Sequence, residues 1–149
     1  MNDLLDIAAN EAGEGVENKD GGPFGAVIVD SNGNIISKGH NMVLSSNDPT
    51  AHAEVVAIRK ACLKLKTHDL SGYTIYSSCE PCPMCLSAII WSNIKCIYFG
   101  ATRDDAARAG FRDSDIYDFM AGNNNMIDKK YRANNKCIDG LKNYKGDIY

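Results

Sequence analysis

The chain has 149 residues, of which 44% are hydrophobic and 23% charged, and its formal net charge is −3. This length predicts one domain with a sizeable core, and the composition is that of a soluble globular protein. The net negative charge disfavours a nucleic-acid-binding function, because nucleic-acid-binding proteins usually carry a basic face. We expect a cytoplasmic protein, because no basic leader follows Met1 and the longest apolar run, near residues 86–91, is too short to span a membrane.

The cysteines do not suggest a disulfide framework, because a chain of this length can build a core without one. We expect a reducing cytosol and buried free thiols. The six are Cys62, Cys79, Cys82, Cys85, Cys96 and Cys137.

The first half of the chain predicts a helix, a hairpin and a second helix. Asn2 or Asp3 can cap the first helix, and apolar residues then recur every four positions from residue 4 to residue 16. Strands at 26–29 and 35–43 flank an Asn-Gly turn, a strong hairpin signal. The second helix begins near residue 51, with Asp48 or Thr50 as its cap. Its expected apolar stripe is Val55, Ile58, Cys62 and Leu65.

The second half predicts a strand at 73–78, a helix at 82–92 and a strand at 96–100, and then a short helix at 115–121. After a polar loop at 122–125, the last twenty residues suggest a weak strand and a helix around 138–144. Strands 73–78 and 96–100 are joined by a helix, so we expect them to be parallel. The fold class is therefore α/β: a three-layer α-β-α sandwich with a mixed central sheet, in a single domain spanning residues 1–149.

A split motif carries the chemistry: His52-Ala53-Glu54, and later Pro81-Cys82-Pro83-Met84-Cys85. This H-x-E and P-C-x-x-C pattern is typical of zinc deaminases of nucleobases. One imidazole and two thiolates are zinc ligands, and three protein ligands leave the fourth position for water. Glu54 is expected beside the metal as a proton carrier.

A closed structural site is the alternative, because Cys79 lies three residues before Cys82 and could complete a Cys3His set. Such sites usually belong to small domains that need the metal to fold, and a closed site gives Glu54 no role. The open site is favoured, with Cys79 as a packing residue at a strand end. In an ideal helix, the side chains of His52 and Glu54 would point about 200° apart around the helix axis. Both can serve one site only if the metal lies over the helix N-terminus.

A cluster of basic residues near the C-terminus is an exception to the net negative charge of the chain. We favour a solvated helix face over a nucleic-acid patch for it. The cluster is Lys129, Lys130, Arg132, Lys136, Lys142 and Lys145.

Four stretches carry a family resemblance. They are residues 21–26 (GGPFGA), 47–54 (NDPTAHAE), 78–85 (SCEPCPMC) and 109–117 (AGFRDSDIY). On these residues the chain resembles the cytidine/deoxycytidylate deaminase superfamily, and the fourth stretch is similar to that of the bacterial guanine deaminases.

The resemblance implies hydrolysis of guanine to xanthine and ammonia, with Zn2+ held by His52, Cys82 and Cys85 and with Glu54 as proton shuttle. It implies purine contacts from Asn41 and the backbone of Ala53, with Asp113 holding the substrate's amino group. It also implies apolar walls from Phe24 and Trp91. Taken alone, Trp91 would be a core residue, Asn41 a loop cap and Asp113 a surface acid.

The resemblance further implies a homodimer. In this family, the C-terminal segment, about 126–149 here, is exchanged between subunits, and a terminal tyrosine, here Tyr149, reaches the partner's site. Without the resemblance, Tyr149 would be a frayed terminus.

Three other functions remain open from the sequence. They are tRNA adenosine deamination, deamination of cytosine or another small base on the same core, and a non-enzymatic zinc module with a closed Cys3His site. The acidic pI near 5.5 and residues 109–117 oppose the first of these, whereas the basic tail weakly favours it.

Overall fold

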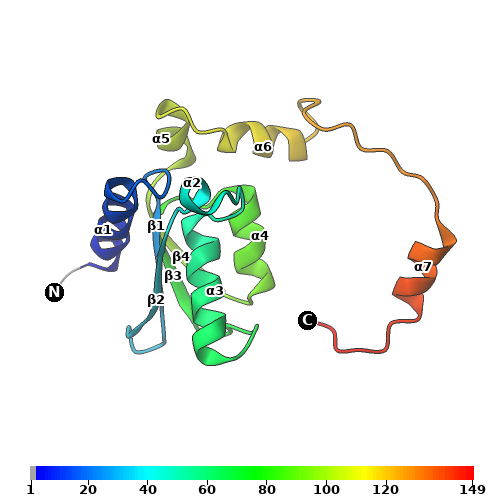
Figure 1. Cartoon of the computed structure of the whole chain (residues 1–149), viewed down its shortest axis with the longest axis horizontal. Helices are drawn as coiled ribbons and strands as arrows, with labels where there is room; N and C mark the ends of the chain where they lie inside the picture. The colour runs from blue at the N-terminus through cyan, green and yellow to red at the C-terminus, as the bar shows by residue number, and fades with distance from the viewer. Residues whose placement is uncertain (1–2) are drawn as a thin grey trace.

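Figure 1 shows a computed structural model of the chain, which describes residues 3–149. A four-stranded sheet in the order β2-β1-β3-β4 forms its centre. The strands are β1 (Gly25–Val29), β2 (Ile35–His40), β3 (Thr74–Cys79) and β4 (Cys96–Ala101). β1 is antiparallel to both β2 and β3, and β3 is parallel to β4. The sheet is therefore mixed, as the sequence predicted.

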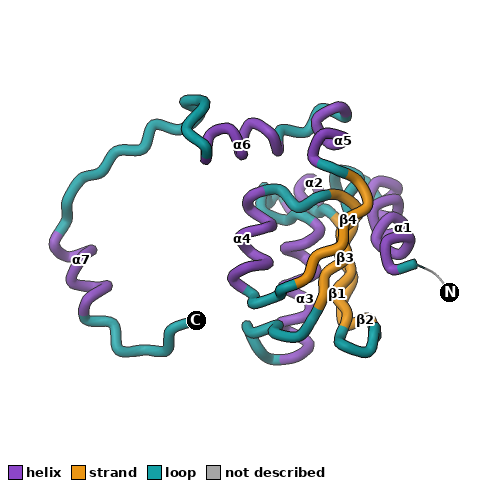
Figure 2. The backbone as a smooth tube through the Cα atoms, turned by 180° about the vertical axis from the view of Figure 1, so that it is seen from behind, coloured by secondary structure: helices purple, strands orange, loops and turns teal. Residues whose placement is uncertain are grey.

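Helices cover both faces of this sheet and make the three layers (Figure 2). α1 (Leu4–Glu17) lies on one face, and α3 (Ala53–Leu65) and α4 (Pro83–Trp91) lie on the other. The remaining helices are α2 (Val43–Ser46), α5 (Arg103–Arg108), α6 (Asp113–Met120) and α7 (Asn135–Lys142). The predicted α-β-α sandwich is confirmed. No helix in the described part of the chain is long and apolar enough to cross a membrane.

The core is built around β1, whose five residues are all buried. Alternate side chains of a strand point to opposite faces. Ala26 and Ile28 accordingly belong to the cluster under α3 and α4, and Val27 and Val29 to the cluster under α1. Burial on both faces explains why β1 is a continuous apolar run rather than an alternating one.

Two elements differ from the prediction near the second helix. β2 ends at His40 rather than at residue 43, because Asn41 starts a turn in which its Oδ1 accepts the N–H of Val43 at 3.0 Å. The N-cap of α3 is His52, not Asp48 or Thr50. Its buried face is Ala53, Glu54, Val56, Ala57 and Ala61. The stripe expected from the sequence is half-buried beside that face, because alanines let α3 lie close to the sheet.

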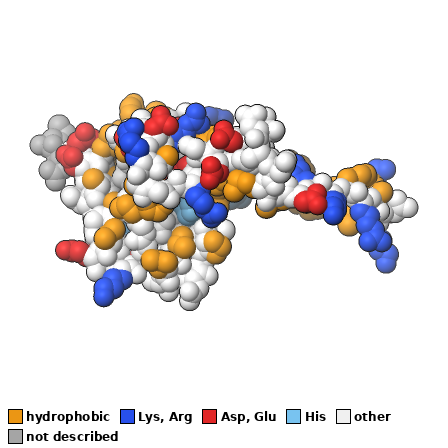
Figure 3. All heavy atoms as spheres, turned by 90° about the horizontal axis from the view of Figure 1, so that it is seen from above, with side chains coloured by type: hydrophobic (Ala, Val, Ile, Leu, Met, Phe, Trp, Pro, Cys, Tyr) orange, Lys and Arg blue, Asp and Glu red, His pale blue; other side chains and the backbone are white. Residues whose placement is uncertain are grey.

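The C-terminal arm, residues 121–149, also differs from the prediction. The structure describes all of it and places α7 there but no strand, because residues 125–134 have no neighbouring strand to pair with. The arm projects from the body, and no residue of α7 is buried (Figure 3). The chain then curves back, so that the ring of Tyr149 lies 6.1 Å from that of Trp91 and 6.0 Å from that of His68.

Candidate functional site

The N-termini of two helices bring three possible metal ligands together. His52 is the N-cap of α3 and Cys82 is the N-cap of α4, both with extended backbone, and Cys85 lies in the first turn of α4. One ligand atom from each of the three lies within 4.8 Å of the others. One imidazole and two thiols at this spacing fit a zinc ion with three protein ligands. Figure 1 shows α3 and α4 side by side on one face of the sheet.

The cap position of His52 removes the conflict between His52 and Glu54. His52 stands just outside the helix, with φ −70° and ψ 156°, whereas Glu54 lies in its first turn. The two side chains therefore do not follow the helical angle of about 200° for positions two apart. Both can reach one site over the helix N-terminus, as the sequence required.

The electrostatics of the cluster favour a thiolate. A hydrogen bond with Cys85 and another with His52 lower the pKa of Cys82 below that of an ordinary thiol. The hydrogen bond between the two cysteines, together with burial, raises the pKa of Cys85. The hydrogen bond with Cys82, whose Sγ lies 3.6 Å from Nδ1, raises the pKa of His52. The positive ends of two helix dipoles add to the stabilisation of negative charge here.

Glu54 is held by a second buried side chain. It is 5% exposed, and the Oγ–H of Ser77 in β3 donates to its Oε1 at 2.6 Å. This hydrogen bond occupies one carboxylate oxygen and so fixes the direction in which the other oxygen points. The carboxylate is therefore oriented before any substrate arrives.

A cavity of about 500 Å³ opens beside this cluster. Its volume lies in the range of small-molecule sites, which is about 300–1,000 Å³. Asp113, the first residue of α6, is half-buried in its wall. Burial, and then the negative charge of Cys82, raise the pKa of Asp113. The lining is Gly21, Gly22, Phe24, Asn41, Val43, Leu44, Pro49, His52, Glu54, Glu80, Cys82, Phe111, Arg112 and Asp113.

Most of the residues expected at the site lie there, but Trp91 and Tyr149 do not. Phe24, Asn41 and Asp113 line the cavity, together with His52, Glu54 and Cys82 of the motif, whereas Cys85 is part of the metal cluster but not of the lining. Ala53 lies between the lining residues His52 and Glu54, but it is fully buried and does not itself line the cavity. Trp91, at the opposite end of α4 from Cys82, is 66% exposed and is absent from the lining. Within one chain, it is therefore not a wall of this cavity.

The sequence reasoning did not assign eight lining residues to the site: Gly21, Gly22, Val43, Leu44, Pro49, Glu80, Phe111 and Arg112. All of these except Val43 and Leu44 stand inside the four stretches that carry the family resemblance, so those stretches carried a signal for them. Phe111 packs edge to face on Phe24, with ring centroids 4.7 Å apart. No pattern in the sequence indicated Val43 or Leu44, because the short helix α2 that carries them was not expected.

Tyr117 links α6 to Pro81, the residue before Cys82. Its Oη–H donates to the carbonyl of Pro81 at 3.0 Å, and the guanidinium of Arg103 lies 4.4 Å from its ring centroid. Tyr117 is one helical turn after Asp113, so the two share a face. The contact thus holds Asp113 over the residues next to Cys82.

Cys79 lies apart from the metal cluster. It ends β3, is 6% exposed, and its Sγ lies 3.6 Å from the carbonyl of Thr102. The only metal-competent group found among residues 3–149 contains His52, Cys82 and Cys85 without it. This geometry supports the open site over the closed Cys3His alternative.

Comparisons with known proteins agree with this geometry. Residues 1–101 match the family described as cytidine and deoxycytidylate deaminase zinc-binding region. Over 114 residues, 76% of this chain and 72% of the relative, the chain is 57% identical to a guanine deaminase of Bacillus subtilis. A tRNA-specific adenosine deaminase of Buchnera aphidicola is 39% identical over 122 residues, 82% of this chain and 79% of the relative.

A solved structure of a guanine deaminase from Bacillus subtilis superposes with a TM-score of 0.88 and 43% identity, covering all of this chain and 99% of that one. The match thus includes the C-terminal arm as well as the sheet and the cavity. Together with the family match over residues 1–101, it shows that the chain belongs to the cytidine and deoxycytidylate deaminase family.

Proposed function

We infer that this protein hydrolyses guanine to xanthine and ammonia. The single observation that carries this inference is the likeness to a guanine deaminase over the whole chain, including α5, α6 and the arm. These are the elements that follow the shared zinc-binding region, which ends at residue 101. The cavity suits a planar base, because Phe24 and Phe111 supply aromatic side chains and Asn41, Glu54 and Asp113 supply polar ones.

The motif residues divide the chemistry between them. His52, Cys82 and Cys85 would hold a zinc ion, which when bound lowers the pKa of water to about 7 and so supplies a nucleophile at neutral pH. Glu54 takes a proton from the attacking water and delivers it to a ring nitrogen. The new hydroxyl group then gives its proton to the amino group, the carbon–nitrogen bond breaks, and ammonia leaves as the carbon becomes a carbonyl. The orientation of Glu54 by Ser77 suits this shuttle.

Substrate orientation falls to Asn41 and Asp113. The Oδ1 of Asn41 already accepts the N–H of Val43, so the group it can offer a base is the Nδ2 amide, as a donor. Asp113 also lines the cavity and can accept from an amino group on the purine. Its raised pKa also lets it carry a proton toward the departing ammonia.

Ammonia release from a panel of bases and tRNA tests this function. The zinc-loaded protein should release ammonia from guanine, and adenine, cytosine, cytidine, guanosine and a tRNA should give far slower release. Deamination of tRNA with a steep dependence on salt would instead support the tRNA adenosine deaminase reading, because phosphate contacts produce such a slope. Zinc binding with no release from any substrate would support the non-enzymatic module.

We further propose that the chain is one catalytic domain whose residues 126–149 are exchanged in a homodimer. Several apolar side chains of the arm are more than half exposed: Ile127, Tyr131, Leu141, Tyr144, Ile148 and Tyr149. The body also exposes Ile90 and Trp91, by 64% and 66%. Exchange of an arm is a common route to a two-fold dimer and would bury these surfaces. Tyr149, which does not reach its own cavity, would then complete the partner's site.

A further inference from the structure

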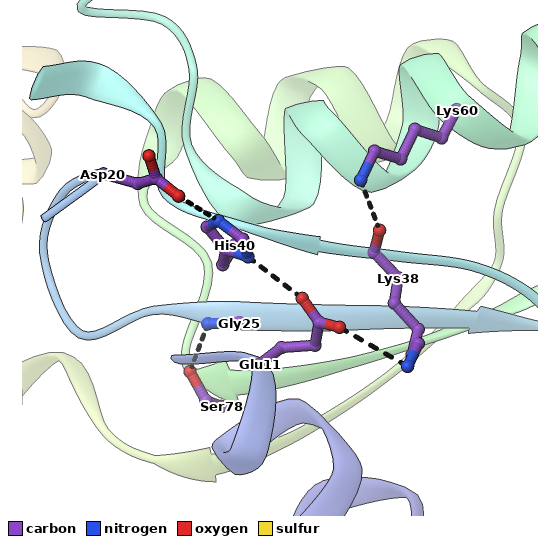
Figure 4. A network of polar contacts seen from close by, with 7 residues as sticks. All are labelled: Glu11, Asp20, Gly25, Lys38, His40, Lys60 and Ser78. Carbon is purple, nitrogen blue, oxygen red and sulfur yellow. Dashed lines mark hydrogen bonds and ion pairs between the residues drawn. The ribbon is translucent and has the colours of Figure 1, made fainter. Parts of the chain in front are cut away.

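A cluster of charged side chains at the end of β2 has no part in the chemistry described above. His40, the last residue of β2, lies between Glu11 of α1 and Asp20 of the loop after α1 (Figure 4). Its Nδ1 is 3.1 Å from Glu11 Oε2, and its Nε2 is 2.8 Å from Asp20 Oδ2. Lys38 Nζ lies 3.5 Å from the other oxygen of Glu11. The side chains of His40 and Glu11 are only 14% and 11% exposed.

When both carboxyl groups are ionised, the two contacts call for a doubly protonated ring. A carboxylate oxygen carries no hydrogen, and a neutral imidazole has a single N–H. Both contacts are hydrogen bonds only when His40 is an imidazolium. Burial opposes that charge, but the hydrogen bonds with Glu11 and Asp20 outweigh it and raise the pKa of His40. The bond with His40 also lowers the pKa of Asp20. These two carboxylates, with Lys38 beyond Glu11, are the charged groups around the ring.

α1 is shaped to receive this ring. A Cβ placed on Gly15 would come within 2.7 Å of His40 Cδ2. A glycine inside a helix is less favourable than an alanine. The close approach of the ring explains why the helix contains one at this position.

The cluster is joined directly to the rim of the cavity. The carbonyl of Asp20 accepts the N–H groups of Leu44 and Ser45, each at 3.0 Å. The next residue, Gly21, lies so close to Asn41 that a Cβ there would come 2.1 Å from Asn41 Oδ1. Asn41 itself follows His40 and donates its N–H to the carbonyl of Phe24 at 3.1 Å.

The rim segments of the cavity, 20–24 and 41–45, are thus held together by backbone hydrogen bonds and by one ionic side-chain tie, His40 to Asp20. Their residues Gly21, Gly22, Phe24, Asn41, Val43 and Leu44 all line the cavity. Loss of the tie would loosen one wall of the cavity without touching Glu54 or the metal ligands.

We propose that His40, as an imidazolium bridging Glu11 and Asp20, is a positioning residue that holds the purine-binding rim in place. The inference rests on the proposed deamination of guanine. Its consequence is a KM that depends on the protonation of His40, while kcat at saturating base does not. Below the raised pKa both contacts are hydrogen bonds. Above that pKa, one ring nitrogen presents a lone pair to a carboxylate, so the rim loosens and KM rises.

The first test is the pH dependence of KM and kcat for guanine with the full-length, zinc-loaded protein. From about pH 6 to about pH 9, a range that begins near the ordinary imidazole pKa of about 6.5, KM should rise about tenfold. A tenfold change corresponds to about 1.4 kcal/mol. Titration of the imidazole NMR signals, assigned by comparison with His40→Gln, should place the pKa of His40 at the midpoint of that rise.

The Asp20→Asn variant separates this tie from ionisation of the substrate. An asparagine amide can accept from the imidazolium or donate to the neutral ring, so both protonation states keep their hydrogen bonds. The alkaline rise in KM should therefore disappear in Asp20→Asn, whereas ionisation of guanine would affect both proteins equally. Asp30→Asn is the matched control. Asp30 accepts from Asn32 and Asn34 in the turn at the far end of the same hairpin, and its replacement should leave the wild-type profile intact.

His40→Gln should show an elevated KM that no longer varies between the two pH limits, with kcat near the wild-type value. A flat KM in the wild type, or an equal alkaline rise in wild type and Asp20→Asn, would overturn the inference alone. So would an His40 signal that titrates at or below the ordinary imidazole pKa. Absence of guanine turnover at every pH would overturn the proposed function, and the inference with it.

Discussion

Replacing Ser77 with alanine tests whether the orientation of Glu54 contributes to turnover. Ser77 is 1% exposed, and its hydroxyl donates to Glu54 Oε1 at 2.6 Å, so the variant leaves a buried carboxylate oxygen without that donor. A hydrogen bond to a charged group contributes about 1.5–3 kcal/mol. At about 1.36 kcal/mol per factor of ten in rate, we expect kcat to fall about 10- to 150-fold. KM and zinc content should stay near wild type, because neither the rim nor the metal ligands change.

Ser37→Ala is the matched control for this variant. Ser37 lies on β2, is 8% exposed, and donates to α3 as Ser77 does, but to the carbonyl of Ala57 at 2.8 Å. Its removal should lower stability by about 0.5–1.5 kcal/mol and leave kcat unchanged. Steady-state ammonia release and thermal unfolding of both variants, each loaded with zinc, measure the difference. Wild-type kcat in Ser77→Ala, or the same loss in Ser37→Ala, would refute the argument.

Three further predictions concern the metal, the proton shuttle and the arm. Cys82→Ala and Cys85→Ala should each lose zinc and activity, because two remaining ligands cannot hold the ion, whereas Cys79→Ala should keep both; metal analysis with ammonia release decides. Glu54→Gln should keep zinc and guanine binding but lose turnover by roughly 10²- to 10⁴-fold, measured by calorimetry and ammonia release, and near-normal turnover would assign the shuttle elsewhere. Removal of the last five residues, including Tyr149, should raise KM or abolish turnover with zinc retained, and mixing this truncation with Glu54→Gln should restore part of the activity. A monomer by light scattering, or a fully active truncation, would contradict the exchanged arm.

The sequence predicted the sheet and the metal cluster because their signals are local. β1 is an apolar run next to an Asn-Gly turn, and the ligands stand in two short motifs whose spacing reflects two helix N-termini. The parallel pairing of β3 and β4 followed from the helix between them. These features need little information from distant parts of the chain.

The missed features depend on contacts that the sequence does not display. α2 has four residues and no capping side chain, so it has no pattern of its own. α5 is six residues long and is marked only by the reciprocal hydrogen bonds of Thr102 and Asp105. The apolar residues after residue 125 suggested a strand, but a strand exists only where another one pairs with it. The Ser77–Glu54 and His40–Asp20 contacts join residues 23 and 20 positions apart, so no local motif could reveal them.

The cavity lies at a boundary between two parts of the chain that differ in how easily they open. Its inner wall, with Asn41, His52 and Cys82, adjoins β2, α3 and α4, which pack on the strand that is buried on both faces. Its outer wall, with Phe111 and Asp113, belongs to α6 and the loop before it, and α6 buries no side chain. Local opening free energies range from near zero up to that of global unfolding, according to such packing. Backbone amides of β1 should therefore exchange with deuterium only on global unfolding, while those of α6 exchange through small local openings. Displacement of α6 would then open the cavity and carry Asp113 with it, while Glu54 and the metal ligands stay fixed to the slowly exchanging core.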